Sequence, residues 1–171
     1  MSLENLNHGN CHMAMNDISN ELLKFCQKHF GYRSNFSVND YLHAFGKESD
    51  ALLYSALFFP DLIEIEHRIF LKRNINDEDE VRKKIINCKK NPKSVSAIEA
   101  NFNFIEVGYL FDCHGRNISD EEEVLLTKKI KVGWEGWLTF KYPYRKFVVK
   151  ILAPEETGST MGLQFYELSK G

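Results

Sequence analysis

The chain has 171 residues, of which 43% are hydrophobic and 27% are charged. This composition is typical of a folded globular protein and excludes the disordered class, which combines low hydrophobicity with high net charge. The formal net charge of −2 provides no long-range attraction to nucleic acid or to an anionic membrane surface.

The segment 1–15 has no basic stretch followed by a continuous apolar run, so it does not predict a secretory signal. His8, Cys11 and His12 lie in it, but three zinc-type ligands without a second ligand pair leave a tetrahedral site incomplete. We predict a flexible tail over 1–15, one domain over 16–171, and neither a metal nor a cofactor. No apolar run is long enough to span a bilayer, which favours a cytoplasmic protein with reduced cysteines and no membrane partner.

Three helices are predicted in the first third of the chain. The first begins after Asn16 or Asp17, whose short side chains suit an N-cap. The second is short and follows a capping box formed by Ser37 and Asp40. The third covers 52–59 before a proline ends it. Because it is apolar on nearly every side, we predict that it is buried at the centre of the fold.

Two strands are predicted at 62–66 and 69–71, since apolar residues alternate with polar ones in the first of them. The connection around His67 contains no Gly or Asn, the residues that favour a tight hairpin turn. Glu64 and Glu66 share one face of the first strand. Two nearby carboxylates could act as general acid and base, and a solvated strand face explains the same pattern more simply.

The middle of the chain predicts a further helix, for which Asn91 and Pro92 have the residue types of the N-cap and the first helical position. Helical spacing of apolar residues continues from Val95 to Phe111, so we predict that this helix reaches Phe111. The residues at 104–111 also alternate as in a strand. The helix is preferred because its phase is unbroken.

The longest helix is predicted to start with a capping box at Ser119. Trp134 and Trp137 mark its apolar face. Gly133 and Gly136 each weaken the helix by about 1 kcal/mol relative to Ala, and we expect them to let another backbone approach the tryptophans.

Two strands at 147–152 and 163–168, joined by a polar loop, predict a terminal hairpin. With no alternation of strands and helices along the chain, the elements indicate an α+β fold, in which a small antiparallel sheet of about four strands packs against five or six helices. The order of FFPD, a Glu-rich strand, a helix ending in YLFD, and WxxWL resembles small bacterial α+β proteins of uncharacterised function. The resemblance implies no activity and no catalytic residue.

Reactive side chains are densest at 112–116, where Cys113 is next to His114. A thiolate beside an imidazole could act as a nucleophile, but catalytic Cys and His residues usually meet through the fold and not as neighbours in sequence. A polar loop between helices explains the cluster more simply. Cys113 and His114 are therefore the candidates for an enzyme, without a defined reaction.

The segment 128–150 contains seven Lys or Arg residues, one acid and several aromatic rings. Cations that contact phosphates and rings that stack on bases form single-strand nucleic-acid surfaces. The two tryptophans fit core packing better, because they lie on the apolar face of the helix. The candidates for an exposed surface that binds another protein are Tyr142, Tyr144, Arg145 and Lys146.

No nucleotide-binding, hydrolase, metalloprotease, kinase or EF-hand motif occurs in the sequence. We therefore predict a non-catalytic protein-binding module, of the immunity or adaptor type, whose partner is another protein. An enzyme using Cys113 or His114 and a nucleic-acid-binding protein using 128–150 are the alternatives. A structure in which two or more of the residues Glu64, His67, His114 and Arg145 converge in a pocket would favour the enzyme.

Overall fold

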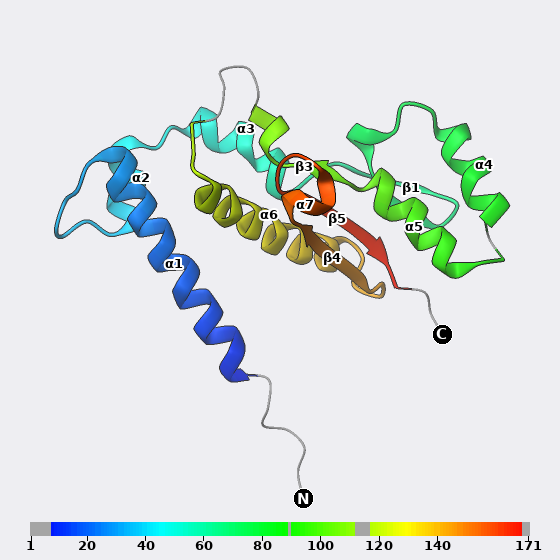
Figure 1. Ribbon diagram of the computed structural model, residues 1–171, viewed down its shortest axis with the longest axis horizontal. Helices are drawn as coiled ribbons and strands as arrows, with labels where there is room; N and C mark the ends of the chain where they lie inside the picture. Colours follow the sequence, from blue (N-terminus) through cyan, green and yellow to red (C-terminus); the bar gives the residue numbers. More distant parts are fainter. Residues whose placement is uncertain (1–7, 89, 112–116, 169–171) are drawn as a thin grey trace, which may run out of the picture. The chain divides into compact units, whose positions relative to one another are not determined.

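The computed structural model describes residues 8–88, 90–111 and 117–168. The chain divides into two compact units, 1–51 and 52–171, and each is described by itself. Its described residues form helices α1 to α7 and two small antiparallel sheets, of two and three strands, which confirms the α+β class (Figure 1). Whether 16–171 behaves as one domain stays a prediction.

The first unit contains α1 (His8–Phe30) and α2 (Val38–Phe45). The predicted start of α1 after Asn16 or Asp17 is wrong, since the backbone is helical from His8. Asn and Asp cost a helix interior at most about 0.7 kcal/mol each, which is too little to stop it. The capping box of α2 is confirmed.

Tyr41 fixes α2 against the end of α1. Its ring is 2% exposed, and its hydroxyl donates to the Gly31 carbonyl at 2.7 Å and accepts from the Arg33 amide at 3.2 Å. Gly31 has a φ of +89°, a conformation that glycine adopts at little cost. The turn between the two helices is therefore set by one glycine and one buried phenol.

Helix α3 (Glu48–Phe58) is not the buried central element that its composition predicts. Leu52 and Leu53 are 76% and 69% exposed. Only its C-terminal end reaches the main core, where Phe58 packs against the buried cluster. A helix that is apolar on all sides still buries only the side that finds a partner, and here most of the core surface is occupied by other elements.

Strands β1 (Leu62–Ile65) and β2 (Arg68–Leu71) form the predicted hairpin. Its two-residue turn consists of Glu66 and His67, with φ values of +50° and +60°. Positive φ at both positions is the geometry of a type I′ turn, which usually requires Asn and Gly. Here two residues that disfavour it adopt it, so tertiary contacts must hold the turn.

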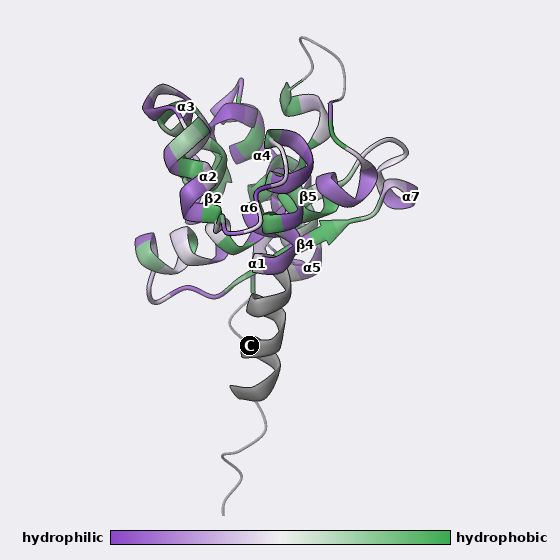
Figure 2. Cartoon of the chain, turned by 90° about the vertical axis from the view of Figure 1, so that its left-hand side faces the viewer, coloured by the Kyte–Doolittle hydropathy of each residue, from purple (hydrophilic) through white to green (hydrophobic). Residues whose placement is uncertain are grey.

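The second sheet has the order β3-β5-β4, with β3 at Ile105–Glu106, β4 at Phe147–Leu152 and β5 at Gly162–Glu167. The predicted terminal hairpin is confirmed, and its hydrophobic residues appear green in Figure 2. The prediction that both hairpins join one four-stranded sheet is wrong, because a side chain occupies the edge of β2.

That side chain is Asn103. Its Oδ1 accepts from the Leu71 amide at 2.8 Å, and its Nδ2 donates to the Ile69 carbonyl at 2.9 Å. These are the groups of β2 that point away from β1, so the amide takes the place of a third strand. Asn103 is fully buried.

Helices α4 (Glu78–Cys88) and α5 (Pro92–Phe102) follow the hairpin, and the Asn91 cap of α5 is confirmed. The helix predicted to continue to Phe111 is wrong beyond Phe102. After Asn103 the chain becomes β3, which pairs with β5, and then the short 3-10 helix η2 at Gly108–Phe111. Hydrogen bonding to the neighbouring strand outweighs the helical spacing.

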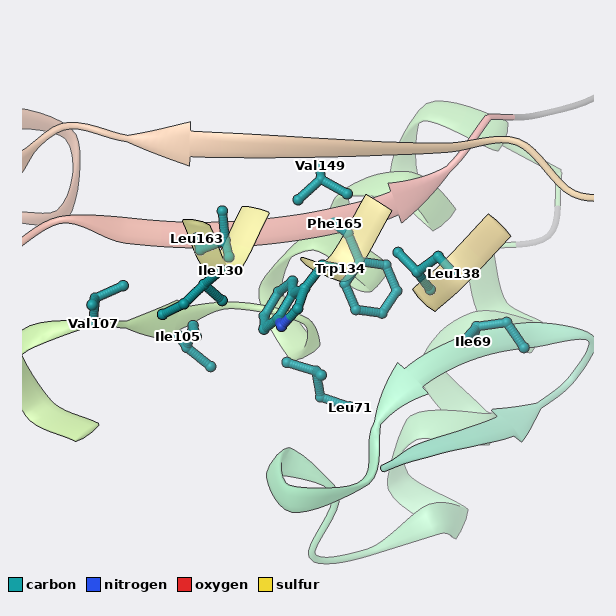
Figure 3. Close-up of a cluster of buried hydrophobic side chains, with 10 residues drawn as sticks. All are labelled: Ile69, Leu71, Ile105, Val107, Ile130, Trp134, Leu138, Val149, Leu163 and Phe165. Atoms are coloured by element: carbon teal, nitrogen blue, oxygen red, sulfur yellow. The ribbon is translucent and has the colours of Figure 1, made fainter. Parts of the chain in front are cut away.

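Helix α6 (Asp120–Lys141) begins at the predicted Ser119 capping box and packs along β4. Trp134 is 2% exposed and donates from Nε1 to the Leu57 carbonyl at 2.8 Å. A short helix, α7 (Pro154–Thr157), lies in the predicted polar loop. Figure 3 shows the main core around Trp134, which consists of Ile69, Leu71, Ile105, Val107, Ile130, Trp134, Leu138, Val149, Leu163 and Phe165.

The expected close approach to the α6 glycines occurs at one of them. A Cβ on Gly133 would lie 3.2 Å from the Cβ, Cδ1 and carbonyl oxygen of Phe58, whereas a Cβ on Gly136 would meet nothing within 4 Å. Gly133→Ala should therefore lose the gain of about 1 kcal/mol that alanine brings to a helix, and Gly136→Ala should keep it. Chemical denaturation of both variants checks this, and equal stabilisation by both would contradict the close contact.

The Asn103 amide gives a second stability prediction. Asn103→Ala leaves the Leu71 amide and the Ile69 carbonyl buried without a partner, at about 1–3 kcal/mol for each group. We expect a loss of at least about 2 kcal/mol in the free energy of unfolding. Asn101→Ala, at an exposed position in the last turn of α5, should change it by less than about 0.5 kcal/mol. Similar small losses in both variants would show that the edge of β2 does not need the amide.

Candidate interaction surface and buried ion cluster

Four side chains at the C-terminal end of α6 and the end of α3 form what we call the aromatic surface: Phe59, Trp137, Phe140 and Lys141. Phe59 meets Trp137 edge to face with 5.6 Å between ring centroids, and Phe140 stacks on Trp137 at 5.8 Å. The Lys141 ammonium lies 4.9 Å from the centroid of the Trp137 ring. The three rings are therefore contiguous.

Trp137 anchors this surface to the backbone. Its Nε1 donates to the Pro60 carbonyl at 3.0 Å, so the indole is fixed by a hydrogen bond as well as by ring contacts. The flanking rings are open to solvent, with Phe59 55% and Phe140 77% exposed. Contiguous exposed apolar side chains of this size mark binding surfaces on soluble proteins.

The apolar character continues along α3. Leu52, Ala56 and Phe59 have the i, i+4, i+7 spacing of one helix face, and all three are exposed. Leu52 and Ala56 lie within α3, and Phe59 lies in the turn that follows it. The surface therefore extends from α3 across Trp137 to Phe140.

The four residues predicted to bind a partner follow Lys141 closely in the chain but differ in their surroundings. Tyr144 is 92% exposed, and Lys146 is also exposed. Tyr142 is half-buried and packs against Phe147 of the core. Arg145 is partly buried, and its guanidinium forms ion pairs with Glu64 and Glu167. The structure thus leaves Tyr144 and Lys146 free to contact a partner.

Arg145 belongs to an ion cluster formed by Glu64, Arg68, Glu99, Arg145 and Glu167. Its Nη2 lies 3.1 Å from Glu64 Oε1, and its Nη1 lies 3.5 Å from Glu167 Oε2. Arg68 Nη1 lies 3.6 Å from Glu99 Oε2 and 4.0 Å from Glu167 Oε2. The cluster joins the β1–β2 hairpin, α5, the turn after α6, and the end of β5.

Three of the four residues named as signs of an enzyme do converge here. Arg145 Nη1 donates to the His67 carbonyl at 3.1 Å, and His67 Nδ1 lies 3.5 Å from Glu64 Oε1. However, the His67 side chain is 92% exposed, and the guanidinium is occupied by carboxylates and a backbone oxygen. The arrangement fastens the hairpin turn to the turn after α6. His114 and Cys113 lie outside the described residues.

Arg68, Glu99 and Glu167 were not among the residues that the sequence singled out, and Glu99 is the most buried of them. It is fully buried, and no hydrogen bond of normal geometry reaches either carboxylate oxygen from the described residues. A signal was present, since Glu99 lies one helical turn from Val95 and one from Asn103, on the buried stripe of α5.

Burial raises the pKa of Glu99 to about 7, and the nearby Arg68 charge opposes this shift only in part. Charge balance agrees with the direction, because the cluster contains three carboxylates and two guanidiniums. One proton makes it neutral. Glu99 is the most buried carboxyl group of the three, so burial raises its pKa and favours binding of that proton there.

In the described part of the chain, no three His, Cys, Asp or Glu side chains are placed to hold a metal ion. None of the described helices has the length and apolarity needed to cross a membrane. Comparisons with protein-family models, with curated proteins and with solved structures find no match. The resemblance to small bacterial proteins therefore stays a prediction.

The buried carboxyl of Glu99 predicts how stability depends on pH. Its pKa is about 7 in the folded protein against an ordinary value of 4.5, so the folded state binds more protons between these values. The contribution of protonated Glu99 to the free energy of unfolding is fully present below pH 4.5. It is lost as pH rises through about 7, by at most about 3 kcal/mol.

Glu99→Gln should remove this pH dependence of the free energy of unfolding, because an amide does not titrate. Glu155→Gln, at an exposed position on α7, should leave it unchanged. Urea denaturation at several pH values measures the effect. Identical profiles for the wild-type protein and Glu99→Gln would show that this carboxyl group does not titrate in the range.

Proposed function

We propose that the chain is a non-catalytic protein-binding module of the immunity or adaptor type, and that it contacts its partner through the aromatic surface. The observation that carries the proposal is the contiguous exposure of Phe59 and Phe140 on either side of an anchored Trp137. Aromatic residues dominate the energetics of protein interfaces, because they bury a large area at a low cost in side-chain entropy.

The anchoring supports binding in a further way. Trp137 is held by the Pro60 carbonyl and by ring contacts on both sides, so its conformation does not have to be fixed when a partner binds. Preorganised side chains lose less entropy on association. Tyr144 and Lys146, in the segment between α6 and β4, are further exposed groups that a partner can contact.

The alternatives stay predictions. An enzyme that uses Cys113 and His114 would require the segment 112–116, and nucleic-acid binding would require cations and free rings within 128–150. The ion cluster favours neither, because its arginines are paired with carboxylates of the same chain. A cytoplasmic location, expected from the sequence, is part of the proposal.

An affinity purification with substituted bait protein tests the proposal. Phe140→Ala should lose the bound partner without a change of more than about 0.5 kcal/mol in stability, because the ring is largely exposed. Tyr32→Ala, at a position that is 73% exposed in the first unit, should retain it. A partner retained equally by both variants, or the absence of any reproducible partner, would contradict binding through the aromatic surface.

A further inference from the structure

The charges beside the aromatic surface indicate what kind of partner fits it. Among the cations of α6 and the following turn and strand, Lys131 pairs with Glu135, Arg145 with Glu64, and Lys150 with Glu156. Lys141 and Lys146 are exposed, and within the described residues no carboxylate lies within ion-pair distance of either. No ion pair joins Lys128 or Lys129, in the first half of α6, to a described carboxylate either. Of these four lysines, Lys141 lies against the rings, 4.9 Å from the centroid of Trp137.

Within the described ranges, no acid forms an ion pair with Lys141 or Lys146. The carboxylate nearest to the surface in sequence is Asp61, next to Pro60 on the Phe59 side of Trp137, and no ion pair joins it to Lys141 or Lys146 among the described residues. Glu135, one helical turn before the end of α6, is already paired with Lys131. The Phe140 end of the surface therefore has an uncompensated positive charge.

A second copy of the chain does not suit this surface. A two-fold symmetric contact brings the same patch of both subunits together, so Lys141 and Lys146 would face positive charge. Like charges across an interface disfavour association. Single-stranded nucleic acid stacks successive bases on free ring faces. The Trp137 ring at the centre of the surface is covered by Phe140 and Lys141, which makes such stacking less favourable here.

Resting on the proposed function, we propose that the partner presents an acidic amphipathic segment, whose aromatic or aliphatic side chains lie on the aromatic surface and whose Asp or Glu residues pair with Lys141 and Lys146. The apolar contact supplies affinity through the buried rings. The charge pairs at the edge supply selectivity and a faster association rate that falls with salt.

A display library of random 16-residue peptides, selected on the full-length protein, tests the proposal. Peptides that bind the wild-type protein and are lost with Phe140→Ala should be enriched in Asp and Glu next to Leu, Phe or Trp. For the best peptide, Lys141→Glu combined with Lys146→Glu should weaken binding by about fivefold to tenfold at low salt, and less at high salt. Lys83→Glu, an exposed lysine of α4, should change it by less than about twofold.

The outcomes separate the two proposals. Peptides that depend on Phe140 but are neutral or basic would overturn the acidic partner and leave the binding module intact. A library in which no peptide depends on Phe140 would overturn both. A Phe140-dependent dimer in light scattering, or Phe140-dependent binding of oligothymidylate, would replace the acidic segment by a second copy or by nucleic acid.

Discussion

One side-chain amide determines how the main part of this fold is joined. Asn103 satisfies an amide and a carbonyl group on the outer edge of β2, at residues more than thirty positions earlier in the chain. In doing so it ends the pairing of the first sheet and sets the point where α5 gives way to β3. Asn74 repeats the device nearby, donating from one amide nitrogen to the Phe102 and Phe104 carbonyls.

Features that depend on neighbours in sequence could be predicted. The capping boxes at Ser37 and Ser119, the proline that opens α5, and the strands of the terminal hairpin all follow from local chemistry. The sheet pairing could not be predicted, because it depends on an asparagine that looks like any other polar residue after a helix. The prediction that α3 is buried is wrong for a related reason. Composition indicates that a helix tends to be buried, but it does not identify the partner that would bury it.

The candidate site divides in the same way. Tyr144 and Lys146 were predicted as exposed because they belong to the basic, aromatic segment 128–150 and lie outside the apolar face of its helix, and the structure leaves them exposed. Phe59 was assigned to a buried helix, and Glu99 was passed over. Both wrong predictions concern long-range packing. How much of Phe59 is exposed depends on its contact with Trp137 of α6, and the burial of Glu99 depends on β2 and β5. Helix α6 contributes to the core and to the aromatic surface. The indole of Trp134 lies inside the core, and that of Trp137 supports the aromatic surface.

The turn at Glu66 and His67 has a consequence for the order of folding. Neither residue favours positive φ, so the hairpin has little reason to close by itself. The contact from Arg145 to the His67 carbonyl that holds it comes from the far side of α6, 78 residues along the chain. Closing a loop of that length precedes any gain from the contact, which makes such pairings slow. Arg82 of α4, 3.6 Å from Glu66 Oε1, can hold the turn from nearby in the sequence. The β1–β2 hairpin therefore gains its contact with Arg145 last, after α6 has docked on β4 and the guanidinium is in place.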